Sequence, residues 1–130
     1  MRNVETYSVN RDEDYLKVAA LDEPGAGGAN HLYLVTGFDT DTNPSYEPVT
    51  PDTSVKILFQ NGPIGEAGIN GVSQEVLLAI VLDRLKSFQA GPYACRENAL
   101  ALTKIEEGLH WLQQRTLARM RRGVEGTHQK

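Results

Sequence analysis

The sequence has little of several features that define whole classes of protein. Cys95 is the single cysteine in 130 residues, so the chain can form neither an internal disulfide nor a cysteine-based metal cluster. No apolar run approaches the roughly 18 residues that a membrane-spanning helix needs, and the first residues contain no apolar signal-peptide segment. These absences favour a cytoplasmic protein, in which Cys95 is expected to pack as a small apolar residue.

Histidines and aromatic residues are also scarce. The three histidines, His31, His110 and His128, are widely separated, and no His, Asp or Glu cluster has the spacing of metal ligands. The sequence therefore indicates neither a metal site nor an acid/base pair, which argues against an enzyme. With a pI of about 5.3 and no aromatic series beside its arginines, the chain does not look like a binder of long nucleic acids.

The charge that is present is divided unevenly along the chain. Residues 1–72 carry 4 basic and 11 acidic side chains, whereas residues 73–130 carry 9 basic and 6 acidic ones. Such a division predicts two regions with different surfaces. From the patterns described next, we assign residues 1–58 to a small β-sheet region and residues 59–130 to a connector and a helical hairpin.

The first region is expected to form a small antiparallel sheet. Three short segments, 15–21, 31–38 and 54–60, are rich in strand-forming residues. The Gly-rich segment 22–30 lacks the Lys-Ser/Thr ending and the following helix of a phosphate-binding loop, so it predicts a hairpin connection. The Pro-rich segment 39–52 predicts a surface loop.

The second region predicts two helices, at 73–89 and 93–122. Ser73 is a plausible N-cap of the first helix, Pro92 suits the first turn of the second, and Gly123 should end it. The fold class is therefore α+β, a small N-terminal antiparallel sheet followed by a long C-terminal antiparallel helical hairpin. An apolar seam with coiled-coil spacing runs along the second helix through Leu102, Ile105, Leu109, Leu112 and Thr116.

The two helices are unequal in length. At 1.5 Å per residue the first is about 25 Å long and the second about 45 Å. The seam continues beyond what the shorter helix can cover, and an uncovered apolar stripe needs another partner. That partner is either the sheet or a second chain, and a second chain is the favoured interpretation.

Four arginines lie near the end of the second helix. Arg115, Arg119 and Arg122 are spaced i, i+4, i+7 and share one face, whereas Arg121 points elsewhere. One interpretation is a solvated basic face, because cations are favoured at a helix C-terminus. The other is a site for a small phosphorylated ligand, which a narrow arginine stripe suits better than a long phosphate backbone.

Three stretches, "FQNGPIGEAGING", "FQAGPYACRENALALTK" and "RMRRGVEGTH", resemble the helical hairpin of phage anti-defence sponge proteins. One branch of that family sequesters glycocyclic ADP-ribose, the signal of Thoeris immunity, and another sequesters the cyclic oligonucleotides of CBASS. The resemblance covers about residues 59 to 128, and the β-rich region before it matches the Thoeris branch in layout. It implies a non-enzymatic protein without cofactor or metal, which binds the signal uncleaved in the cytoplasm of the infected host and keeps it from its effector NADase.

The resemblance also implies the residues of the site. The ligand's base would stack on Phe88, Asn98 would belong to the same site, and Arg115 and Arg119 would hold the pyrophosphate. Family members assemble as hexamers and can hold cyclic trinucleotides at a separate site. Thr127 and His128 are assigned to that second site.

The positions of these residues predict a site between chains. Asn98 and Arg115 lie 17 residues apart on one predicted helix, hence about 26 Å, which one ADP-ribose unit does not span. If all four residues contact one ligand, the arginines come from an antiparallel neighbouring chain. Two alternatives stay open: a sponge chiefly for CBASS cyclic di- or trinucleotides, and a structural phage helical protein without a nucleotide ligand.

Overall fold

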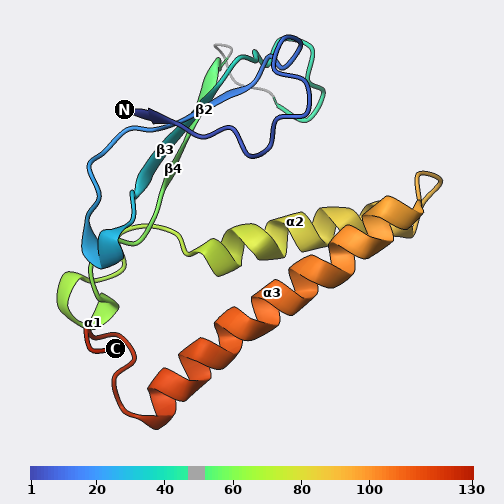
Figure 1. The fold of residues 1–130 in the computed structure, drawn as a ribbon. Coiled ribbons are helices and arrows are strands. Elements are labelled where there is room, and N and C mark those ends of the chain that lie inside the picture. Colours follow the sequence, from blue (N-terminus) through green and yellow to red (C-terminus); the bar gives the residue numbers. More distant parts are fainter. Residues whose placement is uncertain (47–51) are drawn as a thin grey trace. The chain divides into compact units, whose positions relative to one another are not determined.

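A computed structural model describes residues 1–46 and 52–130, and the chain divides into two compact units, Met1–Asn61 and Gly62–Lys130. The first unit holds the strands β1 to β4 and the second holds the helices α1 to α3 (Figure 1). The predicted α+β fold, with an antiparallel sheet before a helical hairpin, is confirmed.

The first unit is a four-stranded antiparallel sheet whose strands follow one another in chain order. The strands are β1 (Arg2–Asn3), β2 (Lys17–Ala20), β3 (Leu32–Thr36) and β4 (Ser54–Leu58). The last three lie within the segments predicted to be strands. β1 was not predicted, because two residues carry no alternating pattern and become a strand only by pairing with β2. The middle of the predicted Pro-rich loop, residues 47–51, lies outside the described residues.

The connection between β2 and β3 is closed by Asp22. Its carboxylate accepts hydrogen bonds from the backbone N–H groups of His31 at 2.9 Å and Leu32 at 3.1 Å. Its backbone carbonyl accepts a third from the side-chain amide of Asn30 at 2.6 Å. The chain turns between these partners through a short 3-10 segment, η1 (Ala26–Gly28), whose last two glycines have positive φ. The Gly-rich segment is therefore a hairpin connection, as predicted.

Because Asp22 is titratable, the stability of this connection should depend on pH. Although desolvation would raise the pKa of the Asp22 carboxyl, the hydrogen bonds from the backbone N–H groups of Leu32 and His31 hold that pKa below its ordinary value. A carboxyl whose pKa is lowered by folding stabilises the fold above its unfolded pKa, and this contribution is lost as pH falls through the folded pKa. We expect the protection factors of the His31 and Leu32 amides, measured by hydrogen exchange, to fall below about pH 4.

Asp22→Asn is the control, because an amide in place of the carboxyl does not titrate. Protection of the same two amides should be lower in this variant than in the wild type at neutral pH, and it should change little on acidification. An equally strong acid dependence in the variant would contradict the assignment to Asp22.

The second unit begins with a one-turn helix, α1 (Ile64–Ala67), followed by the long helix α2 (Gln74–Gln89). α1 was not predicted, since its Gly-rich surroundings resemble a connector. α2 begins as predicted, because the Ser73 hydroxyl accepts a hydrogen bond from the N–H of Val76 at 3.2 Å. This bond satisfies one of the unpaired N–H groups of the first turn.

The turn between the two long helices differs from the prediction. The last helix, α3 (Arg96–Arg121), begins three residues later than expected, and Pro92 lies in the turn before it. The side chain of Gln89 makes two hydrogen bonds to the backbone of Cys95, at 3.1 and 3.2 Å, and these hold residues 90–94 as a turn.

Cys95 has a different role from the one expected. Its sulfur accepts a hydrogen bond from the N–H of Asn98 at 3.4 Å, so Cys95 is the N-cap of α3. It is exposed, and the prediction that it packs as a small apolar residue is wrong. The other end of α3 is as predicted, because Gly123 follows the last turn with a positive φ of 72°.

Few apolar side chains are buried in this chain. Among the described residues the buried hydrophobic ones are Ala20 and Leu82, one in each unit. On α2, Leu78 and Leu85 lie on the same side as Leu82 and are half-buried. Val76 and Ile80, which point away from that side, are 50% and 54% exposed. A helix that is apolar on two sides is normally covered on both, and within residues 62–130 the second apolar side of α2 is left largely exposed.

None of the described helices is both long enough and apolar enough to cross a membrane.

Candidate functional site

At the tip of the hairpin an aromatic ring is available to a ligand. Phe88, near the end of α2, is 41% exposed, and the guanidinium carbon of Arg84 lies 5.6 Å from its ring centroid. Asn98, in the first turn of α3, lies half-buried at the same end of the hairpin. An exposed aromatic face can stack on a nucleobase, and a neighbouring guanidinium adds a cation–π contact. Arg84 was not singled out from the sequence, although its i, i+4 spacing from Phe88 on the predicted helix could have revealed the pair.

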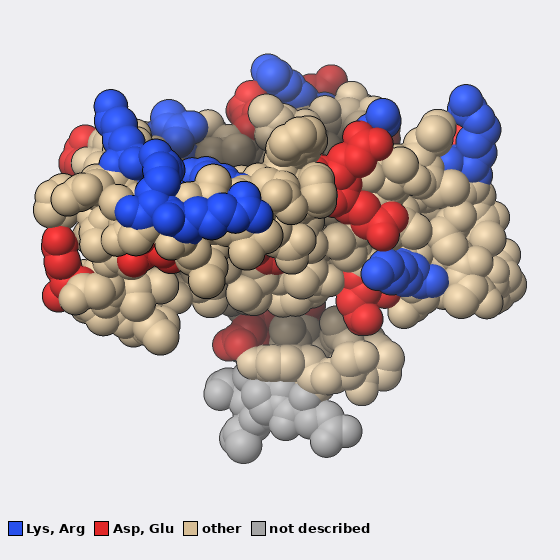
Figure 2. Space-filling model, turned by 90° about the horizontal axis from the view of Figure 1, so that it is seen from below, with Lys and Arg blue, Asp and Glu red and all other residues tan. Residues whose placement is uncertain are grey.

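At the opposite end of α3 the arginines differ from one another. Figure 2 shows Lys and Arg side chains gathered where the C-terminal end of this helix lies. Arg115 is exposed, and the structure shows no hydrogen bond or ion pair between it and any described residue. It can therefore offer its whole guanidinium fork to an anion, a geometry that suits phosphate oxygens.

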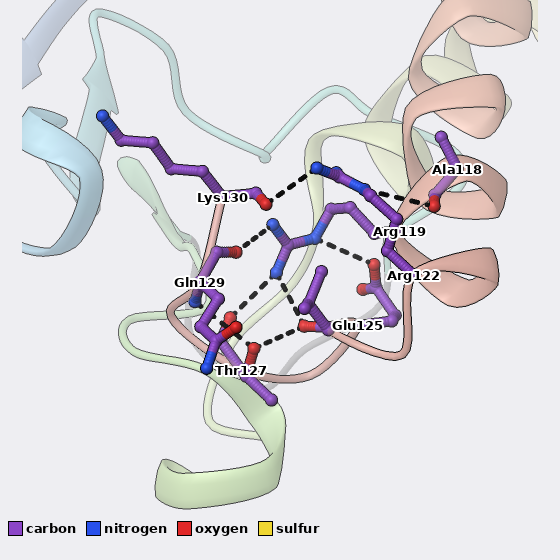
Figure 3. Close-up of polar contacts among 8 residues, drawn as sticks. Ala118, Arg119, Arg122, Glu125, Thr127, Gln129 and Lys130 are labelled. Carbon is purple, nitrogen blue, oxygen red and sulfur yellow. Dashed lines mark hydrogen bonds and ion pairs between the residues drawn. The ribbon is translucent and has the colours of Figure 1, made fainter.

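Arg119, one turn further on, is buried at 8% exposure. Its Nε donates to the Glu125 carboxylate at 3.2 Å, and its Nη2 donates to the carbonyls of Val124 and Thr127, both at 2.9 Å. Its Nη1 donates to the carbonyl of Gln129, so residues 124–129 surround the Arg119 guanidinium (Figure 3). The helix face that Arg115 and Arg119 were predicted to share is therefore not uniformly exposed to solvent.

Arg122, the third member of the predicted stripe, is also engaged. It donates from Nη1 to the backbone carbonyl of Lys130 at 2.9 Å (Figure 3). Arg121 is exposed on another side of the helix. Of the four arginines, Arg115 and Arg121 are thus the two that are exposed and form no hydrogen bond or ion pair with another described residue.

The residues assigned to a second site lie in this C-terminal segment. Thr127 is half-buried, and its hydroxyl donates to the carbonyl of Val124 at 2.5 Å. His128 is exposed, and its Nδ1 lies 2.8 Å from a carboxylate oxygen of Glu66 in α1. Both residues therefore help to hold the segment in place.

The site residues do not converge within one chain. α3 is a single helix from Arg96 to Arg121, so the 17 residues from Asn98 to Arg115 correspond to about 26 Å. The structure groups Phe88 with Asn98 at the tip and Arg115 with Arg119 at the other end. Among the described residues no three His, Cys, Asp or Glu side chains come together as metal ligands.

Comparison with known proteins identifies the hairpin. Residues 51–117, just over half of the chain, match the model of a family described as the Acb2/Tad1 hairpin domain. The chain belongs to this family. The matched range contains Phe88, Asn98 and Arg115 and ends before Arg119.

A relative from a phage is similar to about half of the chain. A Bacillus phage SBSphiJ7 protein named "Thoeris anti-defense 1" is 57% identical over 72 residues, which are 55% of this chain. The aligned residues are 51% of that protein, so the chain spans about half the length of the relative it matches.

Proposed function

We propose that this protein is a phage anti-defence sponge, which binds glycocyclic ADP-ribose without cleaving it and so withholds the Thoeris signal from its effector NADase in the host cytoplasm. The observation that carries the proposal is the 57% identity to a protein named for action against Thoeris, together with membership of the hairpin family. The chemistry of the hairpin supports it, because Phe88 offers a stacking surface and Arg115 an unengaged guanidinium.

The proposed site lies between two chains. The tip of one hairpin supplies Phe88 and Asn98, and the far end of an antiparallel neighbour supplies Arg115 and Arg119. Within one chain, Asn98 and Arg115 lie about 26 Å apart along α3, a distance that a ligand with one ADP-ribose unit does not bridge. Residues from two chains can contact the same ligand without spanning that distance. Arg115 offers its full fork to the pyrophosphate, whereas Arg119, with four hydrogen bonds already made, has one N–H left to offer.

The apolar surface of the hairpin supports assembly into a homo-oligomer. Val76 and Ile80 of α2 and Trp111 of α3 are 50%, 54% and 70% exposed. Met120, one turn beyond the last seam residue Thr116, is 58% exposed, which supports an apolar surface that continues past the predicted seam. A second copy of the chain is the partner that closes both the apolar surface and the ligand site, and we propose a dimer-built hexamer.

We infer a binding role without catalysis, which membership of the anti-defence hairpin family supports. His110 contacts Trp111 edge-on at 5.5 Å, and His128 pairs with Glu66, so neither lies beside the proposed ligand residues at the tip. A nucleotide that is stacked on Phe88 and clamped at its pyrophosphate is bound by contacts that hold it in place.

A release experiment tests the proposal. The protein is incubated with glycocyclic ADP-ribose, free ligand is removed, and the protein is heat-denatured before the supernatant is assayed by chromatography. We expect one intact ligand to be returned for each proposed site. Recovery of an altered nucleotide would indicate an enzyme, and recovery of none would leave a structural protein or a different ligand.

A parallel incubation with cyclic tri-adenylate addresses the second site. If Thr127 and His128 belong to a separate site for CBASS signals, the protein should retain both nucleotides at once, and either should be held in the presence of the other. Retention of the cyclic trinucleotide alone would favour a sponge directed chiefly against CBASS.

A further inference from the structure

The segment after α3, residues 124–130, is here called the C-terminal tail. A guanidinium has five N–H groups, and Arg119 directs four of them at this tail. The Glu125 carboxylate lies 3.2 Å from the Arg119 guanidinium and balances its charge; the Arg119 side chain is only 10% exposed, whereas that of Glu125 is 40% exposed. A bidentate contact with a phosphate needs two N–H groups, so Arg119 cannot form one while the tail is in place.

The tail is held from its other side by α1. The N–H of Gly65 donates to the carbonyl of Gly126 at 2.7 Å, and His128 pairs with Glu66 at 2.8 Å. Gly65 is required for this approach, since a Cβ there would lie 2.7 Å from the Gly126 carbonyl oxygen. The tail thus joins the end of α3 to α1, the helix that comes just before the hairpin in the sequence.

Arg115 and Arg119 therefore have different local chemistry although they lie one turn apart. Arg115 is exposed and unengaged by the described residues, whereas Arg119 is buried in contacts with the backbone of the tail. We propose that Arg119 is a positioning residue, which folds the C-terminal tail against α3 and α1 and influences ligand binding mainly through the tail. This inference rests on the proposed function and deepens it, because it assigns separate roles to the two arginines of the site.

The first test measures tail order without any ligand. In Arg119→Ala, hydrogen exchange at the amides of Gly65 and Thr127 should be faster than in the wild type by about tenfold or more, since several charge-assisted contacts are lost. Arg119→Lys keeps the charge but not the planar fork, so it should restore only part of the protection. Arg121→Ala, which removes an exposed arginine at the same end of α3, should leave both rates unchanged.

A second variant loosens the tail without changing Arg119. Gly65→Ala places a methyl group against the Gly126 carbonyl and should release the tail from α1. Gly108→Ala is the matched control, because a Cβ at that helical position meets no atom within 4 Å. Gly65→Ala should accelerate exchange at Thr127, and Gly108→Ala should not.

The affinity for glycocyclic ADP-ribose then separates positioning from direct contact. If Arg119 acts through the tail, Arg119→Ala should weaken binding about tenfold in the wild-type background and less than about threefold in the Gly65→Ala background. The inference would be overturned if Arg119→Ala weakened ligand binding by the same factor in both backgrounds. Unchanged amide hydrogen exchange in Arg119→Ala would also overturn it. A wild-type protein that binds no ligand would refute the proposed function, whereas the exchange rates would still decide whether Arg119 positions the tail.

Discussion

Ile80→Asp is expected to break the oligomer into smaller species and to abolish ligand binding with it. Ile80 is 54% exposed on the side of α2 that faces away from its buried Leu82, so the substitution should leave the single hairpin folded. In an assembly, the same side chain would carry an unpaired charge into an apolar contact, at a cost of about 3–5 kcal/mol. That corresponds to a loss of more than about a hundredfold in association at each interface.

Sedimentation velocity at micromolar concentration, with circular dichroism to monitor helix content, measures this effect. Thr103→Asp is the control, because it adds the same charge at an exposed polar position of α3. Substitution of the half-buried seam residues Leu109 or Leu112 would be less decisive, since it would disturb the packing within one hairpin as well. A wild-type protein that sediments as a monomer would remove the basis for a site between chains.

Arg115→Ala and Phe88→Ala are expected to give the largest losses of affinity for glycocyclic ADP-ribose. Removal of Arg115 takes away charge-assisted contacts to the pyrophosphate, which should cost about 1.5–3 kcal/mol, or roughly ten- to a hundredfold in affinity. Removal of the Phe88 ring takes away the stacking surface for the base, at about 1–3 kcal/mol. Isothermal titration calorimetry measures both effects.

Arg121→Ala is the matched control, because Arg121 is exposed at the same end of α3 on another side. It should cost less than about 0.5 kcal/mol. If the arginines formed only a solvated basic surface, replacing any one of them with alanine would weaken binding mildly and to the same degree. That loss of affinity would depend strongly on salt concentration.

A mixture of the two defective proteins tests whether the site is shared. When Phe88→Ala and Arg115→Ala chains exchange subunits, some interfaces should combine an intact Phe88 from one chain with an intact Arg115 from its neighbour. Partial binding should therefore return in the mixture although neither protein binds well alone. Absence of rescue, despite demonstrated subunit exchange, would contradict the placement of the ligand between chains.

Local sequence signals predicted much of the secondary structure. Ser73 was recognised as an N-cap and Gly123 as a helix end, because each acts on neighbours within one turn. The strands β2 to β4 were recognised from short runs of strand-forming residues. β1 was missed for the opposite reason, since its two residues are a strand only through their pairing with β2.

The roles of the arginines show what the sequence by itself could not decide. Spacing placed Arg115 and Arg119 near one another on α3, and the structure keeps them on one unbroken helix. Spacing could not show that the chain folds back after Gly123 and surrounds Arg119 with the carbonyls of the tail. That arrangement depends on a contact between Gly65 and Gly126, which are far apart in the sequence. A periodic pattern reports which side of a helix a residue occupies, whereas only the tertiary structure decides whether that side meets solvent or another part of the chain.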